Sequence, residues 1–202
     1  MRIERLAGIG CLVLVAAAQA RGQEREIAVG LGNPQLVPFA LLAQAQATAA
    51  RVYAGIGVKL RWRSQAATEI WMQFDTGVAT GVHPGAMGYA MPYGKGGTRI
   101  HILLDRVRSA GSQKLAGVLL GHVMAHELGH VLEGISRHSD SGLMKARWDG
   151  HDFDQMLVRP LSFSSEDADL IQIGVARWAA RSKAAAQPPR NGRAERTAWR
   201  RG

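Results

Sequence analysis

The sequence predicts a single α+β domain, and three observations lead to this class. Of the 202 residues, 47% are hydrophobic and 20% are charged, which is typical of a globular chain with a buried core. Segments that alternate apolar and polar residues are interspersed with longer segments of helical periodicity. No internal repeat is visible, which argues against solenoids and propellers.

Residues 1–20 have the pattern of a secretory signal peptide. A basic start precedes an apolar run at 6–18, and a small-x-small cleavage site ends at Ala20. The run is shorter than the roughly 20 residues that a membrane span requires. We therefore expect a secreted or periplasmic protein, with a lipid-modified Cys11 as the alternative. Cys11 is the only cysteine, so a disulfide framework and a Cys-rich zinc site are both excluded.

The first part of the domain is expected to form a strand, a helix and a second strand. Residues 26–30 are a strand candidate, and a Gly-Asn-Pro turn follows them. Residues 38–54 have apolar positions at helical spacing, and Gly55 ends this pattern. Residues 58–62 alternate apolar and basic side chains, as a half-buried strand does.

Three more strands and the longest helix are expected next. The strand candidates are 69–74, 88–92 and 99–105. Pro92 favours a position at the sheet edge for the second of them, because proline cannot donate a hydrogen bond to a central ladder. Residues 114–133 form one strongly apolar helix that ends at Gly134.

The C-terminal part is expected to contain a last helix and a tail. The helix opens at Ser164 or Ser165 as N-cap, with acidic residues in its first turn. The acidic segment 148–154 is interpreted as a solvated loop, with a calcium contact as the alternative. The domain therefore covers 21–180, and 181–202 form a flexible basic tail.

The net charge of +9 first suggests a polyanionic partner. Most of it belongs to the tail, which has six arginines and one lysine against one glutamate, whereas residues 21–180 carry a net charge of +2. We expect a polyanion contact through the tail at most and no specific nucleic-acid site. No segment after the signal is apolar enough to span a membrane, and we expect a monomer.

The long helix contains His126-Glu127-Leu128-Gly129-His130, which matches the zinc signature H-E-x-x-H. The two histidines lie one turn apart on one face, so both imidazoles can reach one ion. Glu127 lies beside that ion, where a carboxylate can take a proton from water. We expect catalytic Zn²⁺ with His126 and His130 as ligands; a structural metal site and a metal-free core pair are the alternatives. His122, one turn earlier, is expected to be a core residue or to support a ligand.

Downstream of this motif the chain resembles the metzincin peptidases, and the matrixins in particular. The resemblance rests on Gly134, a histidine that follows it, and Ser141-Gly142-Leu143-Met144, and extends loosely over residues 26–178. It implies that His138 is the third zinc ligand and that Met144 lies beneath the histidines in a Met-turn. The loop from His130 to His138 is longer than the family's.

The resemblance also implies the architecture and the activity. It predicts a twisted, mainly parallel sheet with an edge strand near 88–92 that pairs with an extended peptide, an active-site helix, a Met-turn and a C-terminal helix. The implied function is an exported zinc endopeptidase with Glu127 as general base, acting on peptides or proteins. A non-catalytic zinc-binding domain and a basic interaction protein are the alternatives.

Other residues compete with His138 for the third ligand position. Glu166 is the candidate if the ligand comes from a downstream helix, as in thermolysin-like enzymes, although its place in a first turn has a second explanation in the helix dipole. The remaining candidates are Asp149, His151 and Asp152. His83 and His101 are expected to have no role at the metal.

Overall fold

The computed structural model describes residues 25–63, 68, 70–77, 81–94 and 97–186. The signal peptide expected at 1–20 and the tail residues 187–202 lie outside this description. Export and the polyanion contact therefore stay predictions. None of the described helices is both long and apolar enough to cross a membrane.

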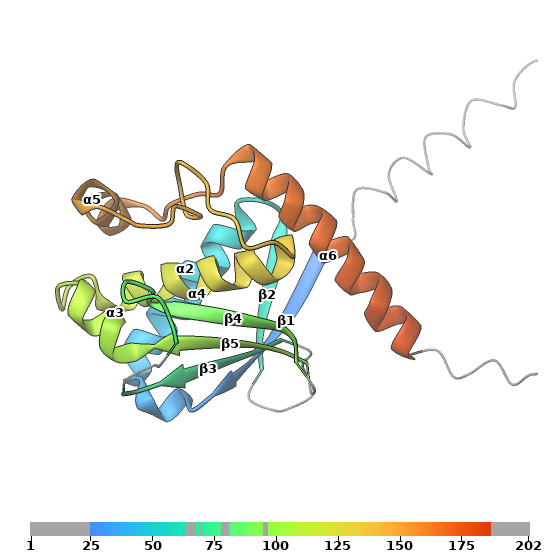
Figure 1. Cartoon of the computed structure of the whole chain (residues 1–202), viewed down its shortest axis with the longest axis horizontal. Helices are drawn as coiled ribbons and strands as arrows, with labels where there is room; N and C mark the ends of the chain where they lie inside the picture. Colours follow the sequence, from blue (N-terminus) through green and yellow to red (C-terminus); the bar gives the residue numbers. More distant parts are fainter. Residues whose placement is uncertain (1–24, 64–67, 69, 78–80, 95–96, 187–202) are drawn as a thin grey trace, which may run out of the picture.

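Five strands form one sheet in the order β2-β1-β3-β5-β4 (Figure 1). Their bounds are β1 Arg25–Gly32, β2 Val58–Arg63, β3 Ile70–Asp75, β4 Gly88–Gly94 and β5 Gly97–Leu103. All neighbours are parallel except β4, which is antiparallel to β5 and lies at the sheet edge. The structure thus confirms the α+β class, the mainly parallel sheet and the edge position of the Pro92 strand.

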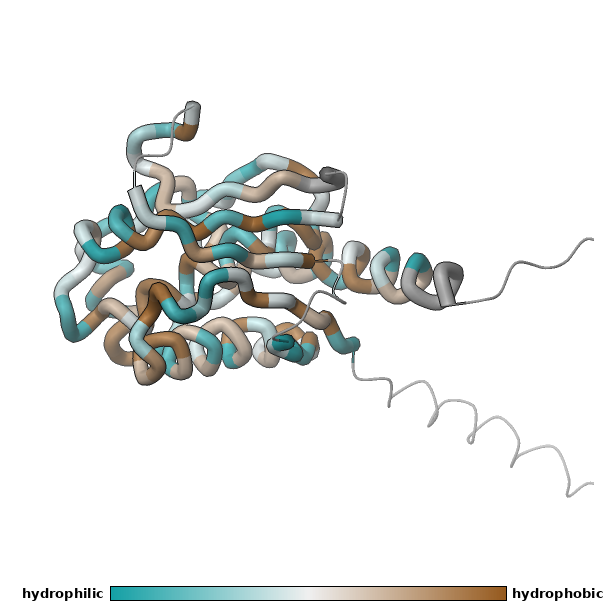
Figure 2. Tube along the Cα trace, turned by 90° about the horizontal axis from the view of Figure 1, so that it is seen from below, coloured by the Kyte–Doolittle hydropathy of each residue, from teal (hydrophilic) through white to brown (hydrophobic). Residues whose placement is uncertain are grey.

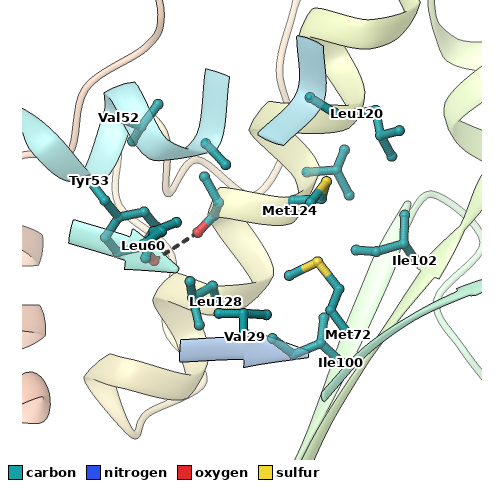
Figure 3. Close-up of a cluster of buried hydrophobic side chains, with 14 of the residues drawn as sticks. Val29, Val52, Tyr53, Leu60, Met72, Ile100, Ile102, Leu120, Met124 and Leu128 are labelled. Atoms are coloured by element: carbon teal, nitrogen blue, oxygen red, sulfur yellow. Dashed lines mark hydrogen bonds between the residues drawn. The ribbon is translucent and has the colours of Figure 1, made fainter. Parts of the chain in front are cut away.

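The core lies between this sheet and two helices, α2 (Phe39–Ala54) and α4 (Ala116–Glu133), that cover one of its faces. Figure 2 shows hydrophobic and hydrophilic residues alternating along the strands, so that one face of the sheet is apolar. Val29, Met72 and Ile100 are fully buried and point into the core in Figure 3. The hydroxyl of Tyr53 in α2 donates to the carbonyl of Ala125 in α4 over 3.1 Å, which joins the two helices inside the core.

Helix α4 is buried along almost its whole length, because α2 covers one side and α6 (Ser165–Ala186) crosses its end. Glycines allow both close approaches. A Cβ at Gly121 would lie 2.6 Å from the carbonyl oxygen of Ala45 in α2, and one at Gly174 of α6 only 1.7 Å from that of Leu132. The helix that carries the H-E-x-x-H residues is therefore held by backbone-to-backbone packing on two sides.

Three elements differ from the sequence-based expectation. The strand expected at 99–105 ends at Leu103, and a short helix, α3 (Leu104–Ala110), follows it. The acidic segment 148–154 is not a loop but opens helix α5 (Gly150–Val158), with Asp149 as N-cap in a capping box. Helix α6 continues to Ala186, past the point near Arg181 where the composition predicted a tail.

Candidate metal centre

The first two histidines of the centre belong to α4, and the third follows the end of that helix. Gly134 caps α4 in the left-handed conformation, with φ 73°, and its N–H bonds to the carbonyl of His130. This ending turns the chain back toward the helix, as a C-terminal glycine does. The loop that follows brings His138 back to a position beside His126 and His130. This loop is longer than the corresponding loop of the metzincins.

The three imidazoles converge. His126, His130 and His138 each offer a ring nitrogen, and these nitrogens lie within 4.8 Å of one another. The ring centroid of His138 is 5.4 Å from that of His126 and 4.9 Å from that of His130. In the part of the chain that the structure describes, this is the only group of metal-binding side chains that meets in this way. The three histidines are therefore close enough to bind one metal ion.

The geometry of His126 and His130 fits a single ion. Nδ1 of His126 donates to the carbonyl of Leu143 over 2.9 Å, which leaves its Nε2 unprotonated, and Nε2 of His130 lies 3.0 Å from that atom. Ligands placed tetrahedrally at 2.0–2.1 Å from zinc are about 3.3 Å apart, so a small adjustment admits the ion. Nδ1 of His130 makes no hydrogen bond of good geometry to the described residues.

Burial keeps these imidazoles neutral, as metal ligation requires. Burial, and then the neighbouring His130, lower the pKa of His126 to about 3. Burial and His138 lower the pKa of His130 to about 4, with the backbone of Ile135 opposing part of the shift. His138 is more exposed, and burial lowers its pKa as well. The three rings thus hold free lone pairs at neutral pH without losing protons first.

Glu127 is buried next to the histidines and against the edge strand. Its side chain is 7% exposed, and burial raises its pKa to about 8. A Cβ at Gly88, the first residue of β4, would lie 2.8 Å from Cγ of Glu127, so only glycine lets the glutamate pack there. The site therefore combines a protonatable carboxylate, two helical imidazoles and the start of the edge strand.

Met144 packs against helix α4, which carries His126 and His130. It is fully buried, and its Sδ would be 2.7 Å from a Cβ at Gly129, which stands between the two helical histidines. Gly142 makes the preceding turn with φ 73°, and the carbonyl of Met144 accepts a hydrogen bond from the backbone of Ser139 over 2.8 Å. The turn at 141–144 thus packs under the helix and also contacts the loop that carries His138.

The competing candidates for the third ligand do not join the cluster. Glu166 is mostly exposed and pairs with Arg137 over 3.3 Å. Asp149 and Asp152 cap α5 and pair with Lys145 over 3.2 and 2.5 Å. His151 is exposed and, like these carboxylates, lies outside the group of converging ligand atoms. Of all the third-ligand candidates, only His138 meets His126 and His130.

The remaining histidines have other partners. His122 is fully buried; its Nδ1 donates to the carbonyl of Val118 over 2.8 Å and its Nε2 accepts from the N–H of Leu161 over 3.0 Å, so neither nitrogen is free for a metal. Nδ1 of His101 lies 2.6 Å from Oδ2 of Asp75, within hydrogen-bond distance. The side chain of His101 is on the face of β5 opposite to Ile100 and Ile102. Nδ1 of His83 accepts a hydrogen bond from the N–H of Gly85.

Two supporting residues were missed by the sequence reasoning. Trp148 lies beside His126, with ring centroids 5.6 Å apart, and its indole N–H donates to the same Leu143 carbonyl that orients His126. Asp167 is fully buried under the loop that carries His138. Asp167 follows Ser164 by three residues, which is the spacing of a capping box. This spacing indicates a helix start and gives no sign of a contact with the loop that carries His138.

No protein-family model matches the chain, and no curated protein matches it in sequence. The function of the chain is therefore inferred from the residues of the site. Three neutral imidazoles and a buried carboxylate around one point can bind a divalent ion and move a proton beside it.

Proposed function

We propose that the protein is an exported zinc-dependent endopeptidase in which His126, His130 and His138 hold one zinc ion and Glu127 is the general base. The observation that carries the proposal is the convergence of three imidazoles beside a buried glutamate. Catalytic zinc sites use three protein ligands and keep one position open, whereas structural sites use four. The turn at Met144 beneath the helix supports the resemblance to the metzincins.

The chemistry divides between the ion and Glu127. A zinc ion held by three imidazoles is a Lewis acid that makes water nucleophilic near neutral pH. Glu127 takes a proton from the attacking water while the water oxygen bonds to the carbonyl carbon of the peptide. It then passes that proton to the leaving amine as the C–N bond breaks. A carboxylate beside the metal-bound water can accept that proton and return it to the leaving amine.

The edge strand supplies a way to align a peptide. Among the described strands β4 pairs with β5 only, so its other edge is a place where an extended chain could be added. Gly88 at the start of β4 contacts Glu127, which brings that edge to the general base. A peptide added as a further strand would pass the site with its backbone extended, as cleavage within a chain requires.

The test is cleavage of a mixed peptide library by the zinc-loaded protein, with products identified by mass spectrometry. We expect Glu127→Gln to bind zinc as the wild type does and to lose cleavage. Glu133→Gln is the matched control: it changes a buried glutamate of the same helix that lies outside the site, and it should retain cleavage. Cleavage retained by Glu127→Gln would exclude Glu127 as the base. A zinc-loaded wild type without cleavage would favour the non-catalytic zinc-binding domain.

A further inference from the structure

Asp167 connects the start of α6 to the loop that carries His138. The carboxylate is fully buried. One of its oxygens, Oδ2, accepts from the N–H of Ser164 over 3.1 Å, and Oγ of Ser164 accepts from the N–H of Asp167 over 3.2 Å. This reciprocal pair caps the helix and leaves the other oxygen, Oδ1, for the loop.

Oδ1 of Asp167 bonds the residues on both sides of His138. Nη2 of Arg137 donates to it over 2.9 Å, and Oγ of Ser139 donates over 2.5 Å. Hydrogen bonds to a buried carboxylate are the strong ones, because the group has no water to replace a lost partner. The side chains immediately before and immediately after the third histidine are thus both bonded to one atom of α6.

Besides these bonds, the loop is fixed next to His138 by the backbone hydrogen bond from Ser139 to Met144, and little else in the described structure holds it. The side chain of His138 is exposed, and its neighbours Ile135, Ser136 and Asp140 are exposed as well. The described residues make no hydrogen bond to its imidazole, whereas the carbonyl of Leu143 orients His126. An exposed loop without such contacts samples many conformations, and each lost conformation costs free energy when the metal binds.

The guanidinium of Arg137 is surrounded by carboxylates. It pairs with Asp167 and, over 3.3 Å, with Glu166, and its charge lowers the pKa of the nearby Glu133, which burial and Asp167 raise. Of these partners Asp167 is completely buried, and Glu166 has 72% of its side chain exposed. The buried pair is the one that holds the loop, since exposed ion pairs contribute little.

We propose that Asp167 is a positioning residue of the metal centre: through Arg137 and Ser139 it holds His138 against His126 and His130, so the C-terminal helix sets the affinity of the site for its ion. The inference rests on the proposed function, since it takes the three histidines as the ligands. Residues that orient metal ligands typically change affinity by about 10- to 100-fold when they are replaced. Asp167 acts on the loop and not on the ion, so its effect must depend on His138.

The test is zinc affinity, measured by competition with a chromophoric chelator. Arg137→Gln and Ser139→Ala remove the two donors and leave the Ser164–Asp167 cap intact, so the fold is expected to persist; thermal unfolding without metal checks this. We expect each to weaken zinc binding, and the pair together by about 10- to 100-fold. Glu166→Gln is the matched control, because it removes an exposed partner of the same arginine, and it should leave affinity unchanged.

A double-mutant cycle separates positioning from general stabilisation. In a His138→Ala background, Arg137→Gln with Ser139→Ala should change zinc affinity by less than about twofold, because the ligand that they position is gone. The absorption spectrum of the Co²⁺-loaded protein gives a second readout: the Arg137/Ser139 variant should resemble His138→Ala more than the wild type.

The outcomes distinguish the inference from the proposed function. If His138→Ala weakens zinc binding and the Arg137/Ser139 variant does not, the positioning role of Asp167 is wrong and the metal centre stands. An equal loss in the wild-type and His138→Ala backgrounds would also overturn it, because it would show an effect that does not pass through His138. A wild-type protein that binds no zinc overturns the proposed function and the inference together.

Discussion

Gly174 of α6 lies directly on the backbone of Leu132 in α4: a Cβ at position 174 would be 1.7 Å from the Leu132 carbonyl oxygen. Leu132 is two residues after His130, and Asp167 lies two turns before Gly174 on the same helix. This crossing therefore places the helix that fixes the ligand loop against the helix that carries the other two ligands.

Gly174→Ala is expected to destabilise the protein by about 1–3 kcal/mol or more, because the obstructing atom is backbone and cannot rotate away. Denaturant unfolding of the metal-free protein measures this. Gly150→Ala is the matched control: a Cβ there meets nothing within 4 Å, so its effect should stay within about 1 kcal/mol. Equal stability of the two variants would show that the helices do not cross so closely.

Gly88→Ala should impair cleavage and spare zinc binding. The new methyl group would lie 2.8 Å from Cγ of Glu127 and 2.9 Å from the carbonyl oxygen of His101, so either the general base or the edge strand must move. A displacement of about 1 Å can lower a rate by about 100-fold. Gly85→Ala, whose Cβ would make only ordinary contacts, should behave as the wild type. A normal cleavage rate in Gly88→Ala would place Glu127 elsewhere.

Glu133→Gln is expected to show a pH-dependent gain in stability in the metal-free protein. Both carboxylate oxygens of Glu133 lack hydrogen-bond partners among the described residues, and burial raises its pKa to about 7. The folded state therefore holds a proton that the unfolded state has lost, so this residue costs stability as the pH rises from about 4.5 to above 7. The variant should match the wild type near pH 4 and exceed it by about 2 kcal/mol near pH 8.5. A difference that does not change with pH would contradict this assignment.

Bound zinc should raise the free energy of unfolding, and by more when the site binds zinc more tightly. At free zinc about 1,000 times the dissociation constant, a single site that is absent in the unfolded chain adds about 4 kcal/mol. Thermal unfolding with buffered zinc and with a chelator measures the difference. At the same free zinc concentration His138→Ala should gain less, whereas Glu166→Gln should gain as much as the wild type. A gain that is unaffected by His138→Ala would mean that the ion binds elsewhere.

The parts of the site that the sequence predicted are those that depend on local spacing. The i, i+4 spacing of His126 and His130 fixes their common face, and Gly134 has the conformation that a helix end requires. The convergence of His138 agrees with the family resemblance, but the contacts that hold it do not follow from local sequence. Asp167 reaches Arg137 from 30 positions away, and such a pairing is set by the crossing of α6 over α4.

The helices that were missed have weak local signals. Helix α5 has only nine residues, and the aspartates at its start suggested a loop although they form a capping box. In α3 the apolar Leu104 continues the pattern of β5, which hides the boundary. Helix α6 extends to Ala186 because alanine has a high helix propensity. The end of this helix lacks apolar residues at helical spacing, so the sequence pattern did not indicate the extension.

Zinc K-edge X-ray absorption measures whether His126, His130 and His138 bind one zinc ion in an open site. We predict one zinc per chain with three imidazole nitrogens at about 2.0–2.1 Å and a light non-protein ligand. His138→Ala should lose one imidazole from that spectrum, and Glu166→Gln should leave it unchanged. Two imidazoles in the wild type, or a carboxylate ligand that disappears in Glu166→Gln, would show that His138 is not the third ligand.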